Sequence, residues 1–134
     1  MPFLIGILLA LAVGLFARTV GFDRDRAFYS TVLIVVASYY GLFAVMGGSG
    51  RTLLLESAGI AAFLLVAIVG FKRNPWFLVA GLFAHSLFDF LHGHLISNSG
   101  VPAWWPMFCL SYDATAAAYL AWLLRRPGAA AKNR

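Results

Sequence analysis

The sequence predicts an all-α integral membrane protein, a five-helix transmembrane bundle that forms a single transmembrane domain over residues 1–134. Two observations support this fold class. First, 62% of the residues are hydrophobic and only 11% are charged, with a mean hydropathy of +0.85, whereas about a quarter of the residues of a soluble domain are charged. Second, the apolar residues form five long runs separated by short connections. So few charged residues cannot solvate a globular surface, and lipid is the expected solvent.

The five apolar runs are the expected spans, because a helix needs about 17–25 mainly apolar residues to cross the hydrocarbon core. The first run is the shortest. It starts with Met-Pro-Phe, without a basic segment, so we interpret it as a span and not as a cleaved signal peptide. The second run ends at a Gly-rich turn, a short basic turn separates the third from the fourth, and the fifth follows a loop that contains Pro and Trp. The expected spans are Pro2–Ala17, Ala27–Met46, Leu53–Phe71, Trp76–Ile96 and Met107–Leu124.

Lysine and arginine predict the direction of the chain, because they are enriched in cytoplasmic connections. With five spans, one side of the membrane receives nine basic residues and the other side receives only Arg51. We therefore expect the N-terminus outside, the C-terminus in the cytoplasm, and a multi-pass protein of the inner (plasma) membrane. The nine residues are Arg18, Arg24, Arg26, Lys72, Arg73, Arg125, Arg126, Lys132 and Arg134.

Six ionisable side chains lie within the predicted spans, where a charge costs roughly 2.5–3.5 kcal/mol on insertion scales. A rise of about 1.5 Å per residue from the outer ends of the spans places all six in the outer half of the bilayer. Unrelated polar positions would not be expected to share one level, so we predict a polar site there. The six residues are Glu56, His85, Asp89, His92, His94 and Asp113.

The fourth span carries an H-x3-D-x2-H element. At about 100° per residue, His85, Asp89 and His92 fall on one face of a helix, and Gly93 can loosen the last turn so that His94 turns back toward them. Neutral imidazole and carboxylate are ligands of transition metals. The element therefore predicts a metal site formed by His85, Asp89, His92 and His94, with zinc favoured and iron or copper as alternatives.

Two acids on neighbouring spans, Glu56 and Asp113, are the candidate catalytic bases of this site. A hydrogen-bonded or protonatable network without a metal is the alternative interpretation of the same residues. Cys109 lies one turn before Asp113, and we interpret it as a packing residue, with a soft-ligand or redox role as the alternative. As the single cysteine, it excludes a disulfide within the chain.

The segment from His85 to Asp113 reads H-S-L-F-D-F-L-H-G-H and then P-A-W-W-P-M-F-C-L-S-Y-D. It resembles uncharacterised small bacterial multi-pass membrane proteins that carry a similar H-x3-D-x2-H element in a late transmembrane helix. The resemblance covers the last two spans. It implies a bacterial origin and a shared polar site, and it implies no particular reaction.

Three functions are compatible with these residues. The first is a membrane-embedded, metal-dependent enzyme, either a hydrolase of a lipid-like or amphiphilic substrate or an oxidoreductase with the same ligands. The second is a proton-coupled transporter or channel subunit, because intramembrane Asp, Glu and His are typical of proton relays. The third is a small accessory subunit of a larger membrane complex, or a homo-oligomer. No span contains lysine, which excludes a retinal Schiff base, and no soluble basic patch supports nucleic-acid binding.

Overall fold

The computed structural model describes residues 1–126 and confirms the all-helical fold class. Within these residues each of the five long helices is long and apolar enough to cross a membrane. Two of the basic residues used to predict direction, Lys132 and Arg134, lie outside the described residues. The elements are α1 (Pro2–Val20), a short 3-10 helix η1 (Phe22–Arg24), α2 (Ala27–Met46), α3 (Gly50–Lys72), α4 (Trp76–Leu95) and α5 (Trp105–Arg125).

Several helices extend beyond the predicted apolar runs, because a helix continues until a capping group ends it. α1 reaches Val20 and stops at Gly21, which adopts a left-handed φ of 96° and donates its N–H to the carbonyl of Ala17. α3 starts at Gly50, directly after Ser49, whose hydroxyl accepts a hydrogen bond from the N–H of Thr52 at 3.2 Å. Hydropathy predicts the stretch of a helix that faces lipid, but it does not predict the capping residues at which the helix begins or ends.

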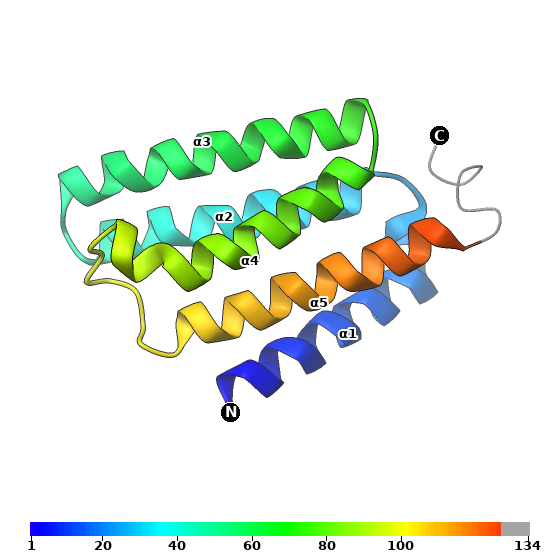
Figure 1. Ribbon diagram of the computed structural model, residues 1–134, viewed down its shortest axis with the longest axis horizontal. Coiled ribbons are helices and arrows are strands. Elements are labelled where there is room, and N and C mark those ends of the chain that lie inside the picture. Colours follow the sequence, from blue (N-terminus) through cyan, green and yellow to red (C-terminus); the bar gives the residue numbers. More distant parts are fainter. Residues whose placement is uncertain (127–134) are drawn as a thin grey trace.

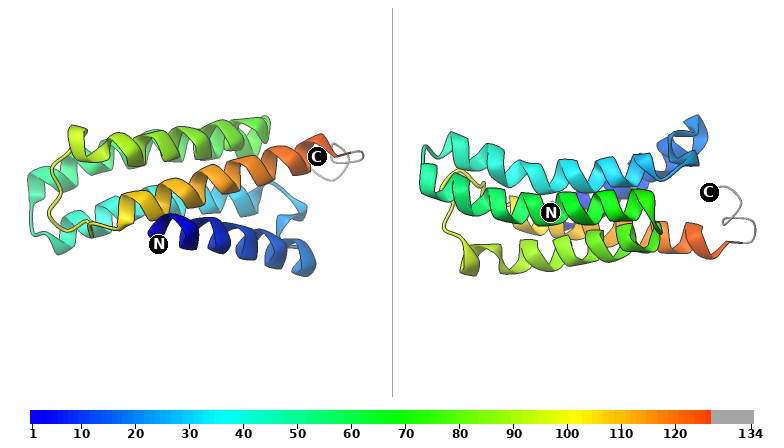
Figure 2. Two further views of the ribbon diagram at one scale, coloured as in Figure 1. Left: turned by 60° about the horizontal axis from the view of Figure 1, so that its bottom comes forward. Right: turned by 90° about the horizontal axis from the view of Figure 1, so that it is seen from above.

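The helices run side by side in alternating directions, with α1 and α3 at opposite edges of the bundle (Figures 1 and 2). α5 packs closely against both α1 and α4, and α2 packs along α3. α1 turns a stripe of small residues toward α5, namely Gly6, Ala10, Gly14 and Ala17, all of them buried. Such stripes let membrane helices approach closely. The stripe thus serves packing within the bundle.

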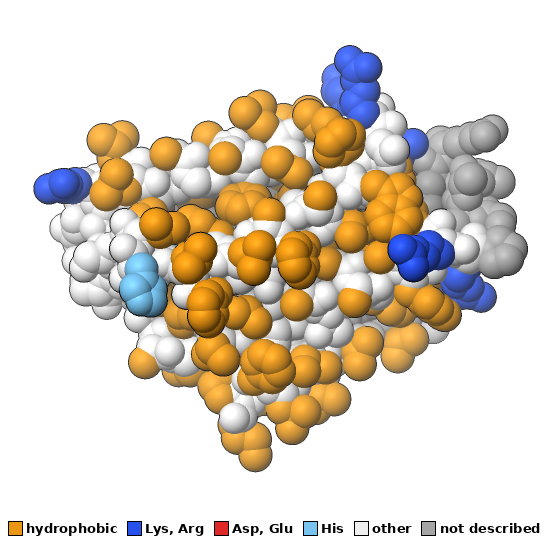
Figure 3. All heavy atoms as spheres, in the orientation of Figure 1, with side chains coloured by type: hydrophobic (Ala, Val, Ile, Leu, Met, Phe, Trp, Pro, Cys, Tyr) orange, Lys and Arg blue, Asp and Glu red, His pale blue; other side chains and the backbone are white. Residues whose placement is uncertain are grey.

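The surface has the pattern of a membrane-spanning bundle. In the view of Figure 3, hydrophobic side chains cover the middle of the face, and lysine and arginine gather toward its two ends. Many large apolar side chains on this surface are exposed, among them Leu54, Leu65 and Phe90. Exposed apolar side chains of this density belong in a lipid environment. The polar side chains lie inside, where they build the site described next.

Candidate functional site

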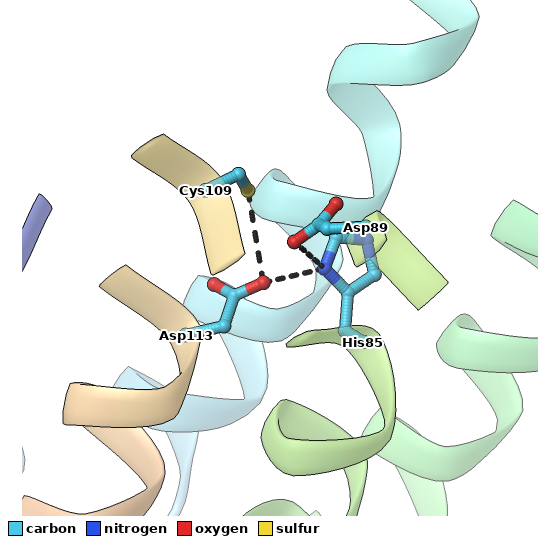
Figure 4. A group of neighbouring side chains, drawn as sticks. All are labelled: His85, Asp89, Cys109 and Asp113. Atoms are coloured by element: carbon cyan, nitrogen blue, oxygen red, sulfur yellow. Dashed lines mark hydrogen bonds and ion pairs between the residues drawn. The ribbon is translucent and has the colours of Figure 1, made fainter. Parts of the chain in front are cut away.

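Four side chains with metal-ligating atoms converge between α4 and α5. His85 and Asp89 are one turn apart on α4, and Cys109 and Asp113 are one turn apart on the facing side of α5 (Figure 4). One ligand atom from each residue lies within 4.8 Å of the ligand atoms of the other three. All four are buried, and the most exposed of them, Cys109, is only 2% exposed. We call these four residues the buried centre.

The distances within the buried centre describe a compact hydrogen-bonded group. His85 Nδ1 lies 2.5 Å from Asp113 Oδ2 and 3.5 Å from Asp89 Oδ2. The Cys109 thiol donates to the same Asp113 oxygen at 3.6 Å. The same imidazole nitrogen, Nδ1, therefore lies close to both carboxylates. Asp113 Oδ2 is in turn the atom that both the histidine and the cysteine contact.

Tyr40 extends the buried centre to α2. Its hydroxyl donates to Asp89 Oδ1 at 2.6 Å, and its side chain is among the most completely buried in the molecule. Ser86, next to His85, donates its hydroxyl to the carbonyl of Leu110 at 2.9 Å and so ties α4 to α5 at this level. Three helices thus fix the centre, which leaves its carboxylates little freedom to move.

A second polar cluster lies on the other side of Tyr40 and consists of Glu56, His92 and Asn98. Glu56 Oε2 lies 2.7 Å from His92 Nε2 and accepts a hydrogen bond from the Asn98 amide at 2.6 Å. The same amide reaches the carbonyl of Tyr40 at 3.2 Å. Asn98 belongs to the loop between α4 and α5, so this contact holds that loop onto the ends of α2 and α3.

Tyr40 separates the two clusters. Its ring stacks on His92, with centroids 3.9 Å apart and an interplanar angle of 14°, while its hydroxyl points to Asp89. Within residues 1–126 no hydrogen bond joins the Glu56–His92 pair directly to the buried centre. The two clusters are therefore neighbours in contact, with separate hydrogen-bonding partners.

The structure brings together only some of the residues that the sequence singled out. His85 and Asp89 lie in the buried centre, whereas His92 pairs with Glu56 and His94 is exposed at the end of α4. A rise of about 1.5 Å per residue separates His85 from His92 by roughly 10 Å along the helix, too far for two ligands of one ion. Of the two candidate bases, Asp113 belongs to the buried centre and Glu56 does not.

Three residues of the two clusters were not among the predicted site residues. For Cys109 the sequence favoured packing and left a soft-ligand role as the alternative, and the structure places its sulfur among the ligand atoms of the buried centre. Tyr40 shares the depth of the other polar groups, but its hydrogen bond to Asp89 depends on how α2 packs against α4. Asn98 lies in a loop, and no sequence pattern indicates that its amide turns inward.

The buried centre carries more acceptors than donors. Asp113 Oδ1 and His85 Nε2 are buried and make no hydrogen bond to any residue within 1–126. No lysine or arginine occurs between residues 76 and 124, so no permanent cation faces the two carboxylates from α4 or α5. Buried carboxylates need a counter-charge, because an isolated ion in a low-dielectric interior is very costly.

An apolar groove of about 830 Å³ reaches the buried centre from the side of α1 and α2. α1 packs on α5 and hardly on α2, and the groove lies between them. Its walls include Ile5 and Leu9 of α1 and Val36 of α2, with Trp104 at the start of α5. Cys109 lines the groove and belongs to the buried centre, so it is the residue at which the two meet.

Comparison with known protein families, curated proteins and solved structures gives no match to this chain. The fold and the buried centre define a helical bundle of membrane-spanning character with a polar core.

Proposed function

We propose that the buried centre binds a transition metal ion, zinc first, and that the protein is a membrane-embedded metal-dependent enzyme. One observation carries the proposal: four buried ligand atoms of three chemical kinds lie within 4.8 Å of one another. Cys sulfur, His nitrogen and carboxylate oxygen are the ligands that zinc takes in proteins, and iron and copper use subsets of them.

The spacing of the ligand atoms supports an ion of this size. Metal–ligand bonds of about 2.0–2.3 Å in a tetrahedron put two ligand atoms roughly 3.3–3.5 Å apart. The separations of 3.5 Å for His85–Asp89 and 3.6 Å for Cys109–Asp113 agree with that value. With Asp113 as a fourth ligand, its 2.5 Å contact with His85 would have to lengthen by roughly 0.8 Å as the hydrogen bond is exchanged for a metal bond, and separations that approach 4.8 Å would have to shorten.

The groove supports a lipid-like or amphiphilic substrate. A pocket of about 830 Å³ falls within the usual size range of small-molecule sites, and its mainly apolar walls suit a hydrocarbon chain. A chain in the groove would end beside Cys109, at the edge of the buried centre. Hydrolysis needs an open position on the ion and a proton acceptor near the reacting group. With His85, Asp89 and Cys109 as the three protein ligands, Asp113 would serve as that acceptor, since its Oδ1 is buried without a hydrogen bond within residues 1–126. Glu56 also has a buried oxygen, Oε1, without a hydrogen bond within residues 1–126, but Glu56 is paired with His92 outside the buried centre and is therefore less suited as the base.

Metal content tests this proposal directly. The detergent-purified protein is compared by elemental analysis with His85→Ala and with His94→Ala, a matched control that removes an exposed histidine from the same helix. We expect about one zinc, iron or copper per chain in the wild type and in His94→Ala, and a loss of at least tenfold in His85→Ala. No metal in the wild type after purification without chelators, or equal loss in both variants, would overturn the metal site.

Activity is tested separately with a panel of lipid esters and amides presented in mixed micelles. We expect the metal-loaded wild type to release fatty acid, and Asp113→Asn at the same metal content to release at least about 100-fold less. Metal-loaded protein that hydrolyses none of the panel would refute the hydrolase while leaving the metal site intact.

We also infer that the N-terminus lies outside and the C-terminus lies in the cytoplasm of a bacterial inner membrane. In support, seven of the eight basic residues within 1–126 are in or beside the helix ends at which α1, α3 and α5 finish, and Arg51 alone lies at the other end. Cytoplasmic connections attract such residues. Fusion of alkaline phosphatase to the C-terminus should give no periplasmic activity, whereas a fluorescent protein at the same position should fluoresce. The reverse result would invert the topology.

A second candidate function rests on the short hydrogen bond in the buried centre. The 2.5 Å contact of His85 with Asp113 and the 2.6 Å contact of Tyr40 with Asp89 are strong bonds of a kind that can hold and pass protons without a metal. In that case protons supply the counter-charge, and the chain acts as a proton-coupled transporter or channel subunit. Proton flux into liposomes that is present in metal-free wild type and absent in Asp89→Asn would favour this function.

A further inference from the structure

A second cavity, of about 540 Å³, opens at the end of the bundle where α1, α3 and α5 finish. It is separate from the buried centre and shares no lining residue with it. Four arginines line it, Arg18, Arg24, Arg26 and Arg126, contributed by α1, η1, the start of α2 and the end of α5. Parts of the chain that are far apart in the sequence thus bring guanidinium groups to one opening.

Among the described residues, the carboxylates that line this cavity are fewer than its arginines. Two acids, Asp23 and Asp25, line it beside the four arginines, an excess of two positive charges within residues 1–126, and Arg26 also donates to the carbonyl of Phe71 at 3.3 Å. The Asp25 side chain accepts a hydrogen bond from the N–H of Ala27 at 2.8 Å and so caps α2. Asp23 is held 3.8 Å from Arg18, with only 3% of its side chain exposed. The excess charge favours an anion.

A buried hydroxyl marks the inside of the cavity. Tyr29 is 5% exposed and lines the cavity, and its hydroxyl makes no hydrogen bond to any residue within 1–126. A buried hydroxyl without a partner is unfavourable, so a ligand that accepts its hydrogen bond binds more tightly. The guanidinium of Arg24 likewise makes no ion pair within those residues.

The remaining lining is apolar. Four leucines line the cavity together with the charged residues, namely Leu78, Leu120, Leu123 and Leu124. A small inorganic anion would gain nothing from leucine, whereas a molecule with a phosphate group and a hydrocarbon segment would use both parts. Basic pockets between transmembrane helices at the membrane surface bind phospholipid headgroups in this way.

We propose that this cavity binds the phosphate of an anionic phospholipid, with the arginines and Tyr29 on the phosphate and the leucines on the first acyl carbons. Arginine suits this task, because its planar fork pairs with two phosphate oxygens at once. The site is independent of the buried centre and of the reaction proposed for it.

Lipid binding is measured by native mass spectrometry in neutral detergent, with short-chain phosphatidylglycerol as the probe. The test variant is Arg24→Gln/Arg126→Gln, which removes two charges from the cavity without leaving Asp23 unpaired. The matched control is Lys72→Gln/Arg73→Gln, which removes two charges near the same end from residues that do not line the cavity. We expect one bound lipid in the wild type and the control, and affinity at least about tenfold weaker in the test variant.

Tyr29→Phe provides a second variant that deletes one hydroxyl and keeps the packing. We expect its affinity for phosphatidylglycerol to fall about threefold to tenfold, with binding of phosphatidylcholine weak throughout. Equal losses in the test and control variants would reduce the effect to surface charge and overturn the site. If soluble glycerol phosphate binds as tightly as the lipid, the lipid is overturned as the occupant. If Tyr29→Phe binds phosphatidylglycerol as tightly as the wild type does, the Tyr29 hydroxyl has no part in binding.

Discussion

Removal of one buried hydroxyl should test whether the buried centre is as tightly organised as its distances imply. Tyr40→Phe deletes the donor of the 2.6 Å hydrogen bond to Asp89 Oδ1 and keeps the ring that stacks on His92. No cavity forms, so the loss of stability reports the hydrogen bond alone. Tyr39→Phe is a matched control, because Tyr39 is its neighbour, is 36% exposed, and makes no side-chain hydrogen bond within residues 1–126.

The expected cost of Tyr40→Phe is about 1.5 kcal/mol. Hydrogen bonds between membrane helices average about 0.6 kcal/mol, and bonds to charged groups reach about 1.5–3 kcal/mol. The acceptor here is a buried carboxylate whose other oxygen makes no hydrogen bond within residues 1–126 and lies 3.5 Å from His85 Nδ1. The cost of losing this hydrogen bond should therefore lie above the average for bonds between membrane helices. The unfolding free energy of Tyr39→Phe should stay within about 0.5 kcal/mol of the wild type.

Unfolding by SDS in mixed micelles, followed by tryptophan fluorescence, measures both variants. The same substitution is then repeated in the Asp89→Ala background, where the Tyr40 hydroxyl has already lost its acceptor. There Tyr40→Phe should cost nothing or should stabilise the protein. Equal costs for the two tyrosines, or an undiminished cost in the Asp89→Ala background, would refute the role given to this hydrogen bond.

Two further predictions concern packing and the second cluster. A Cβ on Gly14 would lie 2.8 Å from the Tyr119 ring. Gly14→Leu should therefore separate α1 from α5, destabilise the bundle by about 1–3 kcal/mol and expose α1 to protease. A Cβ on Gly93 would meet no atom within 4 Å, so Gly93→Ala should have little effect. Glu56→Ala strands His92 without its carboxylate and should cost at least about 2 kcal/mol in the same unfolding assay. Unchanged protease resistance in Gly14→Leu, or wild-type stability in Glu56→Ala, would contradict these packing and pairing arguments.

The fold was largely predictable because hydropathy depends on local composition. The second predicted span, Ala27–Met46, coincides with α2. The ends that moved are set by groups that hydropathy does not register, such as the left-handed Gly21 and the hydroxyl of Ser49. The first predicted run, the shortest of the five, is a helix of 19 residues because the helix continues as far as the cap at Gly21.

The site was predictable in its ingredients but not in its grouping. Shared depth correctly indicated that five of the six ionisable residues are buried, all except the exposed His94, but depth does not tell which helix faces which. His85 meets Asp113 because α4 packs against α5 at that level, whereas His92 meets Glu56 of α3 nearer the end of the helix. The separation of His85 from His92 along one helix was itself calculable from the sequence, and it argues against a shared ion.

The charges of the two clusters explain why a cation is expected at only one of them. Glu56 faces His92 in a one-to-one pair, and a single proton on the imidazole makes that pair neutral. The buried centre sets Asp89 and Asp113 against His85 alone, so one negative charge is left over even with the imidazole protonated. Without a metal, a further proton would balance this charge, whereas a divalent ion held by a neutral imidazole would balance the two carboxylates, since the low-dielectric interior does not tolerate an isolated charge. His92→Ala should therefore leave metal content unchanged where His85→Ala abolishes it, and a loss of metal in His92→Ala would mean that the two clusters form one site.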